Sequence, residues 1–235
     1  MKLLLTSAGI SNSTILHALE ELLGKPLAQS RAVYIPTAIH AVPGGVEYVW
    51  EMLESVVPAE WGNFGILELT ALPSLHREHW LSSLAAADAV LVGAGNTPFL
   101  SYWFRRSGLI EVLPGILKSA VYVGVSAGTL LAGARFRIDQ GRVEREGVYD
   151  DDLYGDTAPV GFGSSETLGL VDFAIMPHLD SPDFDDMSLN RIERNTTGAA
   201  YVLDDSSAVM VNDRQVTVIS EGDWHYLPGT TQVFS

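Results

Sequence analysis

Short apolar stretches alternate with amphipathic stretches along the first half of the chain, and this alternation restricts the fold more than any other feature. The apolar stretches predict strands at residues 2–6, 31–36, 65–70 and 120–125, and residues 87–95 predict a strand that runs into a glycine loop. The stretches between them predict helices, the first from a Ser/Asn cap to Gly24 and the others over about 45–56, 77–86, 97–106 and 109–119. Strand–helix alternation favours a mostly parallel sheet with helices on both faces, so we expect an α/β fold.

The second half of the chain is less regular. Residues 134–167 are polar and predict an excursion of loops and short strands outside the core. A strand at 172–178, a helix near 185–197 and strands within 199–220 follow. With 235 residues, 47% of them hydrophobic, and no repeat or linker, we expect a single domain over residues 1–235.

The composition excludes several classes of function. The chain has 29 acidic and 14 basic residues, a net charge of −15, which argues against nucleic acid and anionic membranes as partners. It has no cysteine, which excludes disulfides, thiolate metal sites and cysteine nucleophiles. The three leucines near the N-terminus are too few for a signal peptide, and no later stretch approaches the roughly 20 apolar residues of a membrane helix. These features predict a cytoplasmic location.

A G-x-S-x-G pattern at Gly124, Ser126 and Gly128 lies between a predicted strand and a predicted helix. This context is typical of a nucleophile elbow, in which small flanking residues allow the sharp turn that exposes the serine. The backbone N–H of Ala127, at the start of the helix, is then the first candidate donor to an oxyanion.

A nucleophilic serine needs a base, and His178 is the best placed candidate. It ends the predicted strand FAIMPH, which we expect to be a central strand, so it lies at the same carboxyl edge as Ser126, where active sites of open α/β folds lie. The other histidines lie in helices, in loops or near the end of the chain: His17, His40, His76, His79 and His225.

The carboxylate that would orient His178 has two candidates. Asp205 ends the strand YVLDD, whereas Asp156 lies in the polar excursion. Turn capping is the alternative role for either residue and for the neighbouring Asp204.

The glycine loop VGAGNT, residues 92–97, is a candidate for a second oxyanion donor. It lacks the G-K-[ST] ending and the GxGxxG spacing of phosphate-binding loops. We expect the backbone N–H of Gly95 to lie against the serine instead.

Taken together, GAGNTPFL, YVGVSAG, LGLVDFAIMPH and YVLDDSSAVMV resemble the dipeptidase E (aspartyl dipeptidase) family, whose relatives include cyanophycinase. The resemblance implies a flavodoxin-like fold akin to class I glutamine amidotransferase domains, with serine in place of their cysteine. It implies Ser126 as nucleophile and His178 as base. It places the acid at Asp205, where glutamate is usual in the family, and a second family aspartate at Asp156.

The resemblance also implies a substrate. Aspartyl dipeptidases cleave after an N-terminal aspartate, and Arg191 and Arg194 match the family's arginines that would pair with its carboxylate. A solvated helix face is the alternative role for these arginines. Asn96 and Thr97 of the GAGNT motif are further substrate-binding candidates. The chain departs from the family in GAGNT for GGGNT, MPH for NPH and a longer excursion after the serine.

The leading hypothesis is therefore a serine peptidase acting on small Asp-X peptides, with no metal or cofactor. A second hypothesis keeps the same residues but assigns β-aspartyl-arginine peptides as substrate. A third is a binding module that has kept the fold without the chemistry. The sequence leaves open whether the protein is a homo-oligomer.

Overall fold

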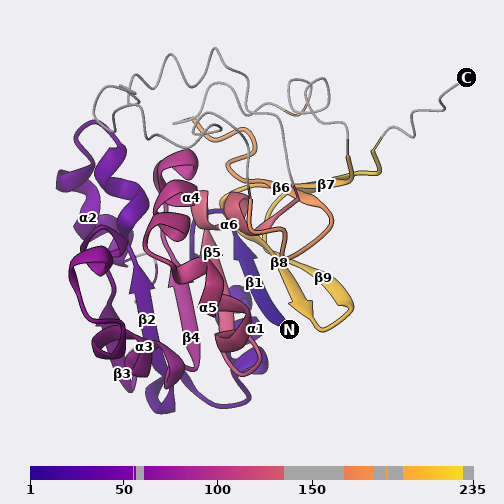
Figure 1. Ribbon diagram of the computed structural model, residues 1–235. Helices are drawn as coiled ribbons and strands as arrows, with labels where there is room; N and C mark the ends of the chain where they lie inside the picture. The colour runs from indigo at the N-terminus through magenta and orange to yellow at the C-terminus, as the bar shows by residue number, and fades with distance from the viewer. Residues whose placement is uncertain (55, 57–60, 135–166, 183–188, 190–197, 230–235) are drawn as a thin grey trace, which may run out of the picture.

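The computed structural model describes residues 1–54, 56, 61–134, 167–182, 189 and 198–229. Figure 1 shows its larger sheet, whose central strands are parallel and end at the top of the view. The sheet has seven strands, in the spatial order β3 (Asn63–Ile66), β2 (Arg31–Ile35), β4 (Ala89–Val92), β5 (Val121–Val125), β1 (Lys2–Thr6), β8 (Ser207–Asn212) and β9 (Gln215–Ser220). The first five are parallel, and β8 and β9 are antiparallel to their neighbours.

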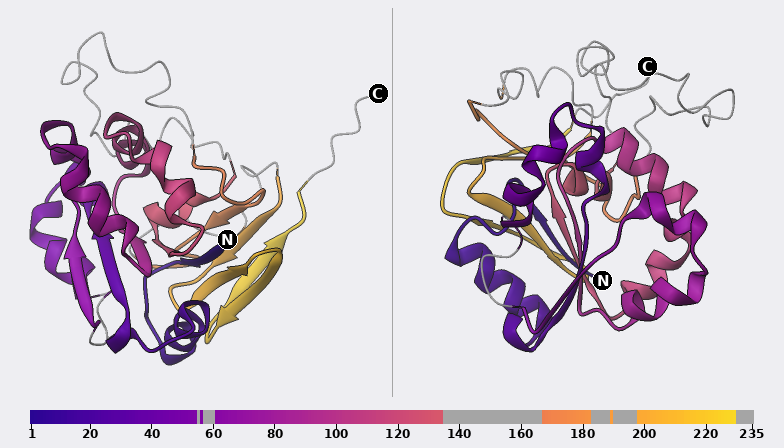
Figure 2. Two further views of the ribbon diagram at one scale, coloured as in Figure 1. Left: turned by 60° about the horizontal axis from the view of Figure 1, so that its bottom comes forward. Right: turned by 90° about the vertical axis from the view of Figure 1, so that its left-hand side faces the viewer.

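Helices cover both faces of this sheet (Figure 2). One face packs against α1 (Ser13–Leu23) and α2 (Gly45–Glu54), and the other against α3 (Arg77–Ala85), α4 (Thr97–Arg106), α5 (Leu109–Ile116) and α6 (Ala127–Ala132). Successive strand residues point to opposite faces, so Leu3 and Leu5 enter one core while Leu4 enters the other. The α/β prediction is confirmed, as are the predicted Ser/Asn cap, which is Asn12, and the end of α1 at Gly24.

A smaller sheet holds three strands, in the order β10 (Trp224–Leu227), β7 (Ala200–Leu203) and β6 (Ala174–Met176). The strand predicted at 172–178 is therefore not a central strand of the main sheet, which corrects the sequence interpretation. A main-chain hydrogen bond links the small sheet to the helix that follows β5, since the N–H of Ala134, just after α6, donates to the carbonyl oxygen of Phe173, just before β6, at 2.8 Å. The end of α6 and the start of β6 therefore lie side by side.

One further predicted element and one strand that was not predicted also differ between the sequence interpretation and the structure. The strand predicted at 65–70 is wrong in extent, because β3 ends at Ile66 and Leu69–Ser74 forms a 3-10 helix. The side chain of Glu68 accepts a hydrogen bond from the N–H of Thr70 at 3.1 Å, which caps this short helix. The β10 strand was not predicted.

The helix predicted near 185–197 and nearly all of the polar excursion lie outside the described residues. No helix within the described ranges is long and apolar enough to cross a membrane.

Candidate active site

Ser126 lies in a sharp turn between β5 and α6. Its φ of 49° and ψ of −103° are unusual for a residue with a side chain, and such a conformation costs about 1–3 kcal/mol. The flanking glycines make the turn possible. A Cβ at Gly128 would overlap the carbonyl oxygen of Val92, and one at Gly124 would lie 2.8 Å from the backbone nitrogen of Thr129. The spacing of the G-x-S-x-G pattern thus follows from close backbone packing.

Hydrogen bonds from buried groups fix this turn to the end of β1. The N–H of Ser126 donates to the carbonyl oxygen of Thr6 at 3.2 Å, and the hydroxyl of Thr129 donates to the same oxygen at 2.7 Å. The hydroxyl of Thr6 in turn donates to the carbonyl oxygen of Gly124 at 2.7 Å. Because Thr6 and Thr129 are fully buried, these bonds hold the strained serine in place.

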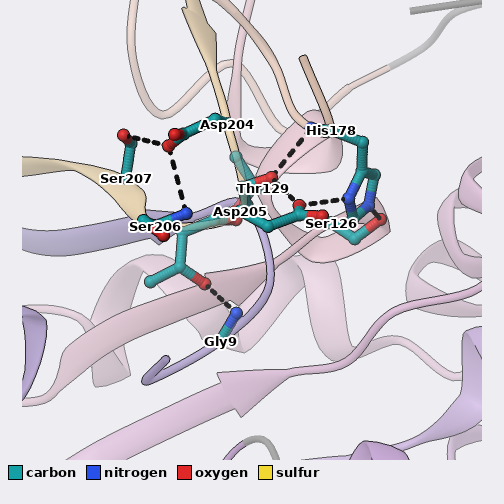
Figure 3. Close-up of polar contacts among 10 residues, drawn as sticks. Gly9, Ser126, Thr129, His178, Asp204, Asp205, Ser206 and Ser207 are labelled. Carbon is teal, nitrogen blue, oxygen red and sulfur yellow. Dashed lines mark hydrogen bonds and ion pairs between the residues drawn. The ribbon is translucent and has the colours of Figure 1, made fainter. Parts of the chain in front are cut away.

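The imidazole of His178 lies between Ser126 and Asp205 (Figure 3). Its Nε2 is 2.7 Å from Oγ of Ser126, and its Nδ1 is 2.6 Å from Oδ1 of Asp205. An ionised carboxylate can only accept, so Nδ1 carries the proton and Nε2 is left to accept from the serine hydroxyl. The side chain of His178 is 12% exposed. This is the geometry in which a histidine can remove a proton from a serine.

Asp205 lies in the turn between β7 and β8. Burial opposes ionisation of its carboxyl group, but hydrogen bonds from His178, Ser7 and Ser181 outweigh that effect and hold the pKa of Asp205 below its usual value. The carboxyl group is therefore ionised at neutral pH and can stabilise a charged imidazole.

The neighbouring Asp204 has a different set of partners. Its carboxylate accepts hydrogen bonds from the N–H of Ser206 at 3.0 Å, the hydroxyl of Ser207 at 2.5 Å and the N–H of Asp223 at 2.6 Å. These contacts close the turn before β8. The capping role that the sequence allowed for either aspartate thus belongs to Asp204, and Asp205 faces the histidine.

The glycine loop follows β4, which is the neighbour of β5 in the sheet. Gly95 has a φ of 129°, and a Cβ there would overlap the backbone of Ala38. The N–H of Asn96 donates to the carbonyl oxygen of Ala38 at 2.9 Å, and its buried side chain accepts from the N–H of Phe99 at 3.1 Å as the cap of α4. Thr97 is the first residue of that helix and is partly exposed.

The sequence matches the model of peptidase family S51 over residues 3–219. The chain belongs to peptidase family S51. This confirms the family resemblance that the four motifs predicted.

The similar sequences include two proteins named Peptidase E. The chain is 32% identical over 154 residues to Peptidase E of Streptomyces coelicolor, covering 65% of this chain and 54% of that protein. It is 28% identical over 176 residues to Peptidase E of Citrobacter koseri, covering 72% and 66%. The matched region thus spans about half to two thirds of the length of these curated relatives.

Two solved structures share the fold of this S51 member. One is a candidate peptidase E protein of Listeria monocytogenes, with a TM-score of 0.64 and 22% identity, covering 94% of this chain and 98% of that one. The other is a peptidase from an acI-B1 actinobacterium, with a TM-score of 0.59 and 14% identity, covering 98% and 95%. At these identities the likeness supports the α/β fold alone.

The structure brings together three of the side chains singled out from the sequence, Ser126, His178 and Asp205. Asp156, Arg191 and Arg194 lie outside the described residues. Among the residues that are described, no three His, Asp or Glu side chains gather closely enough to hold a metal ion.

The sequence interpretation missed Ser7, which directly contacts both His178 and Asp205. One signal was present, since Ser7 follows the first predicted strand. The carboxyl end of a parallel strand is where site residues of this fold class lie.

Proposed function

We propose that the protein is a serine peptidase in which Ser126 is the nucleophile, His178 the general base and Asp205 the acid that orients the base. The observation that carries the proposal is the continuous pair of contacts through His178, 2.7 Å to the Ser126 hydroxyl and 2.6 Å to the Asp205 carboxylate. A serine hydroxyl is a weak nucleophile without a neighbouring base, and this arrangement supplies one.

In the proposed reaction Oγ of Ser126 attacks the carbonyl carbon of the peptide as its proton moves to Nε2 of His178. Asp205 stabilises the resulting imidazolium through Nδ1. The imidazolium then gives the proton to the departing amine, which leaves an acyl group on Ser126. A water molecule, deprotonated by His178, hydrolyses this ester and regenerates the serine.

The negative charge that forms on the carbonyl oxygen needs donors close to Ser126. We assign this role to the backbone N–H of Ala127, at the start of α6, and to that of Gly95, in the loop after the neighbouring strand β4. Fixed backbone donors of this kind are worth about 10²–10³ in rate each. The support is topological, because β4 and β5 are parallel neighbours and both loops lie at one edge of the sheet.

The substrate class we propose is the dipeptide with an N-terminal aspartate. The support is the sequence resemblance to aspartyl dipeptidases together with the two relatives named Peptidase E. Arg191 and Arg194 are the residues we propose to pair with the aspartate side chain, because a guanidinium binds a carboxylate through two parallel hydrogen bonds.

The test is steady-state hydrolysis of Asp-Leu, β-Asp-Arg and Ala-Leu by the wild-type protein and by Ser126→Ala. We expect Asp-Leu to be cleaved best and Ser126→Ala to lose at least about 10³-fold in kcat. Preferred cleavage of β-Asp-Arg would instead support the second hypothesis, in which β-aspartyl-arginine peptides are the substrate. Wild-type activity in a folded Ser126→Ala variant would overturn the proposed mechanism.

A further inference from the structure

Ser7 lies at the point where the strands carrying the proposed nucleophile and acid converge. It is the first residue after β1, and β1 is hydrogen-bonded to β5 on one side and β8 on the other. Ser126 directly follows β5, and Asp205 comes two residues before β8. Ser7 is fully buried, and its N–H donates to the carbonyl oxygen of Ser207 at 3.2 Å, so its position is fixed by the backbone.

The hydroxyl of Ser7 makes two hydrogen bonds. It donates to Oδ1 of Asp205 at 2.8 Å, the same oxygen that binds Nδ1 of His178. It accepts from the backbone N–H of His178 at 2.8 Å. The directions of both bonds are fixed, because an ionised carboxylate can only accept a hydrogen bond and a backbone N–H can only donate one.

The backbone of His178 needs such a contact. Its φ of 64° is in the left-handed region, which is unfavourable for a residue with a side chain. A residue holds such a conformation only where its surroundings impose it. The bond from the His178 N–H to Ser7 is one such constraint, and it fixes the point from which the imidazole extends toward Ser126.

We propose that Ser7 is a positioning residue that holds the acid and the base of the site in register through one hydroxyl; this inference rests on the proposed function. It acts through His178 and Asp205 and does not touch the reacting atoms. Its removal takes away the acceptor that Ser7 offers to the N–H of His178 and leaves Oδ1 of Asp205 with one donor fewer.

The experiment measures kcat and KM for Asp-Leu across pH in the wild type and Ser7→Ala. We expect kcat to fall about ten- to one-hundredfold with KM nearly unchanged, because the misplaced base acts in the transition state. We also expect the acid limb of the kcat/KM profile to move, because the carboxylate that pairs with the imidazolium loses one of its donors. Ser7→Cys keeps a weak donor and acceptor and should lie between the two proteins.

Two control variants distinguish a positioning role of Ser7 from a general loss of protein stability. Ser30 is also fully buried, and its hydroxyl donates to the carbonyl oxygen of Pro26 at 3.0 Å. It directly precedes β2, so it lies at the amino end of the parallel strands, away from the site. Ser30→Ala should lose stability while keeping the kcat and pH profile of the wild type.

Ser181→Ala removes a donor to Asp205 but leaves the bond from Ser7 to His178 intact, so it should shift the acid limb with a smaller loss of kcat.

Reaction with a fluorophosphonate probe distinguishes the failure of this inference from the failure of the proposed function. If the wild type is labelled at Ser126 but cleaves none of the peptides, only the substrate proposal fails, and the labelling rate of Ser7→Ala must still fall about tenfold or more. Folded Ser7→Ala or Ser7→Cys with wild-type rates and an unchanged pH profile would overturn the role of Ser7 alone. A folded wild type that neither reacts nor cleaves would overturn both.

Discussion

The hydroxyl of Ser126 lies 2.7 Å from Nε2 of His178, although 52 residues separate them in sequence. Ser126 follows a central strand of the seven-stranded sheet, whereas His178 follows β6 of the three-stranded sheet. The contact therefore depends on how the two sheets meet. Hydrogen bonds on both sides of that junction, through Thr6 for the serine and Ser7 for the histidine, explain why two strained residues can face each other.

Asp205→Asn should reduce kcat by about 10³–10⁴ with little change in fold. An amide in place of the carboxylate can present its N–H₂ to Nδ1, which favours the wrong tautomer, and it cannot stabilise the imidazolium. The matched control is Asp204→Asn, since Asp204 closes the turn and makes no contact with His178 among those described. We expect that variant to lose stability in urea unfolding and to keep the wild-type kcat once the rate is expressed per folded molecule.

The same kinetic assay on Asp156→Asn decides which of the two candidate carboxylates, Asp156 or Asp205, orients His178. Asp205 is the one in contact with the imidazole, at 2.6 Å. We therefore expect Asp156→Asn to keep kcat within a few-fold of the wild type. A loss at Asp156 as large as that at Asp205 would contradict the assignment.

The stabilising contribution of Asp205 should depend on pH with a definite sign. The pKa of this carboxyl is lower in the folded protein than its usual value of about 4, so its ionised form favours the folded state above that pH. The contribution is lost as pH falls through the folded value. The free energy of unfolding of the wild type minus that of Asp205→Asn should be constant near pH 7 and shrink below about pH 4. A difference that stays constant down to pH 2 would argue against an ionised, hydrogen-bonded carboxylate.

Gly128→Ala should destabilise the protein by about 3 kcal/mol and remove activity, because the new Cβ would overlap the carbonyl oxygen of Val92. The matched control is Gly115→Ala in α5, where a Cβ meets no atom within 4 Å. That variant should be more stable by roughly 0.5–1 kcal/mol, since alanine favours a helix. Urea unfolding of both variants checks the pair, and a Gly128→Ala protein with wild-type stability would refute the packing explanation of the elbow.

The α/β fold and the elbow could be predicted because both depend on local patterns. Apolar runs define buried strands, and the glycines around Ser126 reflect steric contacts within one turn and its nearest strand. His178 and Asp205 could be proposed by the type of residue and its place after a strand. Their pairing with Ser126 could not be derived from spacing, because it depends on the second sheet, which the sequence interpretation merged with the first.

Ser7 was missed for a related reason. A serine in a turn after a strand is common, and its importance here comes from tertiary neighbours that join β1 to both β5 and β8. Likewise the end of β3 at Ile66 depends on Glu68, whose carboxylate caps a 3-10 helix that apolar patterning does not predict. Periodicity anticipates neither the tertiary contacts of Ser7 nor the local cap that the Glu68 side chain forms.

The most direct measurement is mass spectrometry of the wild-type protein after reaction with a fluorophosphonate probe, with Ser126→Ala as control. If His178 activates Ser126, one equivalent of probe should attach to the wild type, peptide mapping should place it on Ser126, and the Ser126→Ala protein should stay unmodified. Folded wild-type protein that takes up no probe, or takes it up on another residue, would contradict the role of Ser126 as the nucleophile.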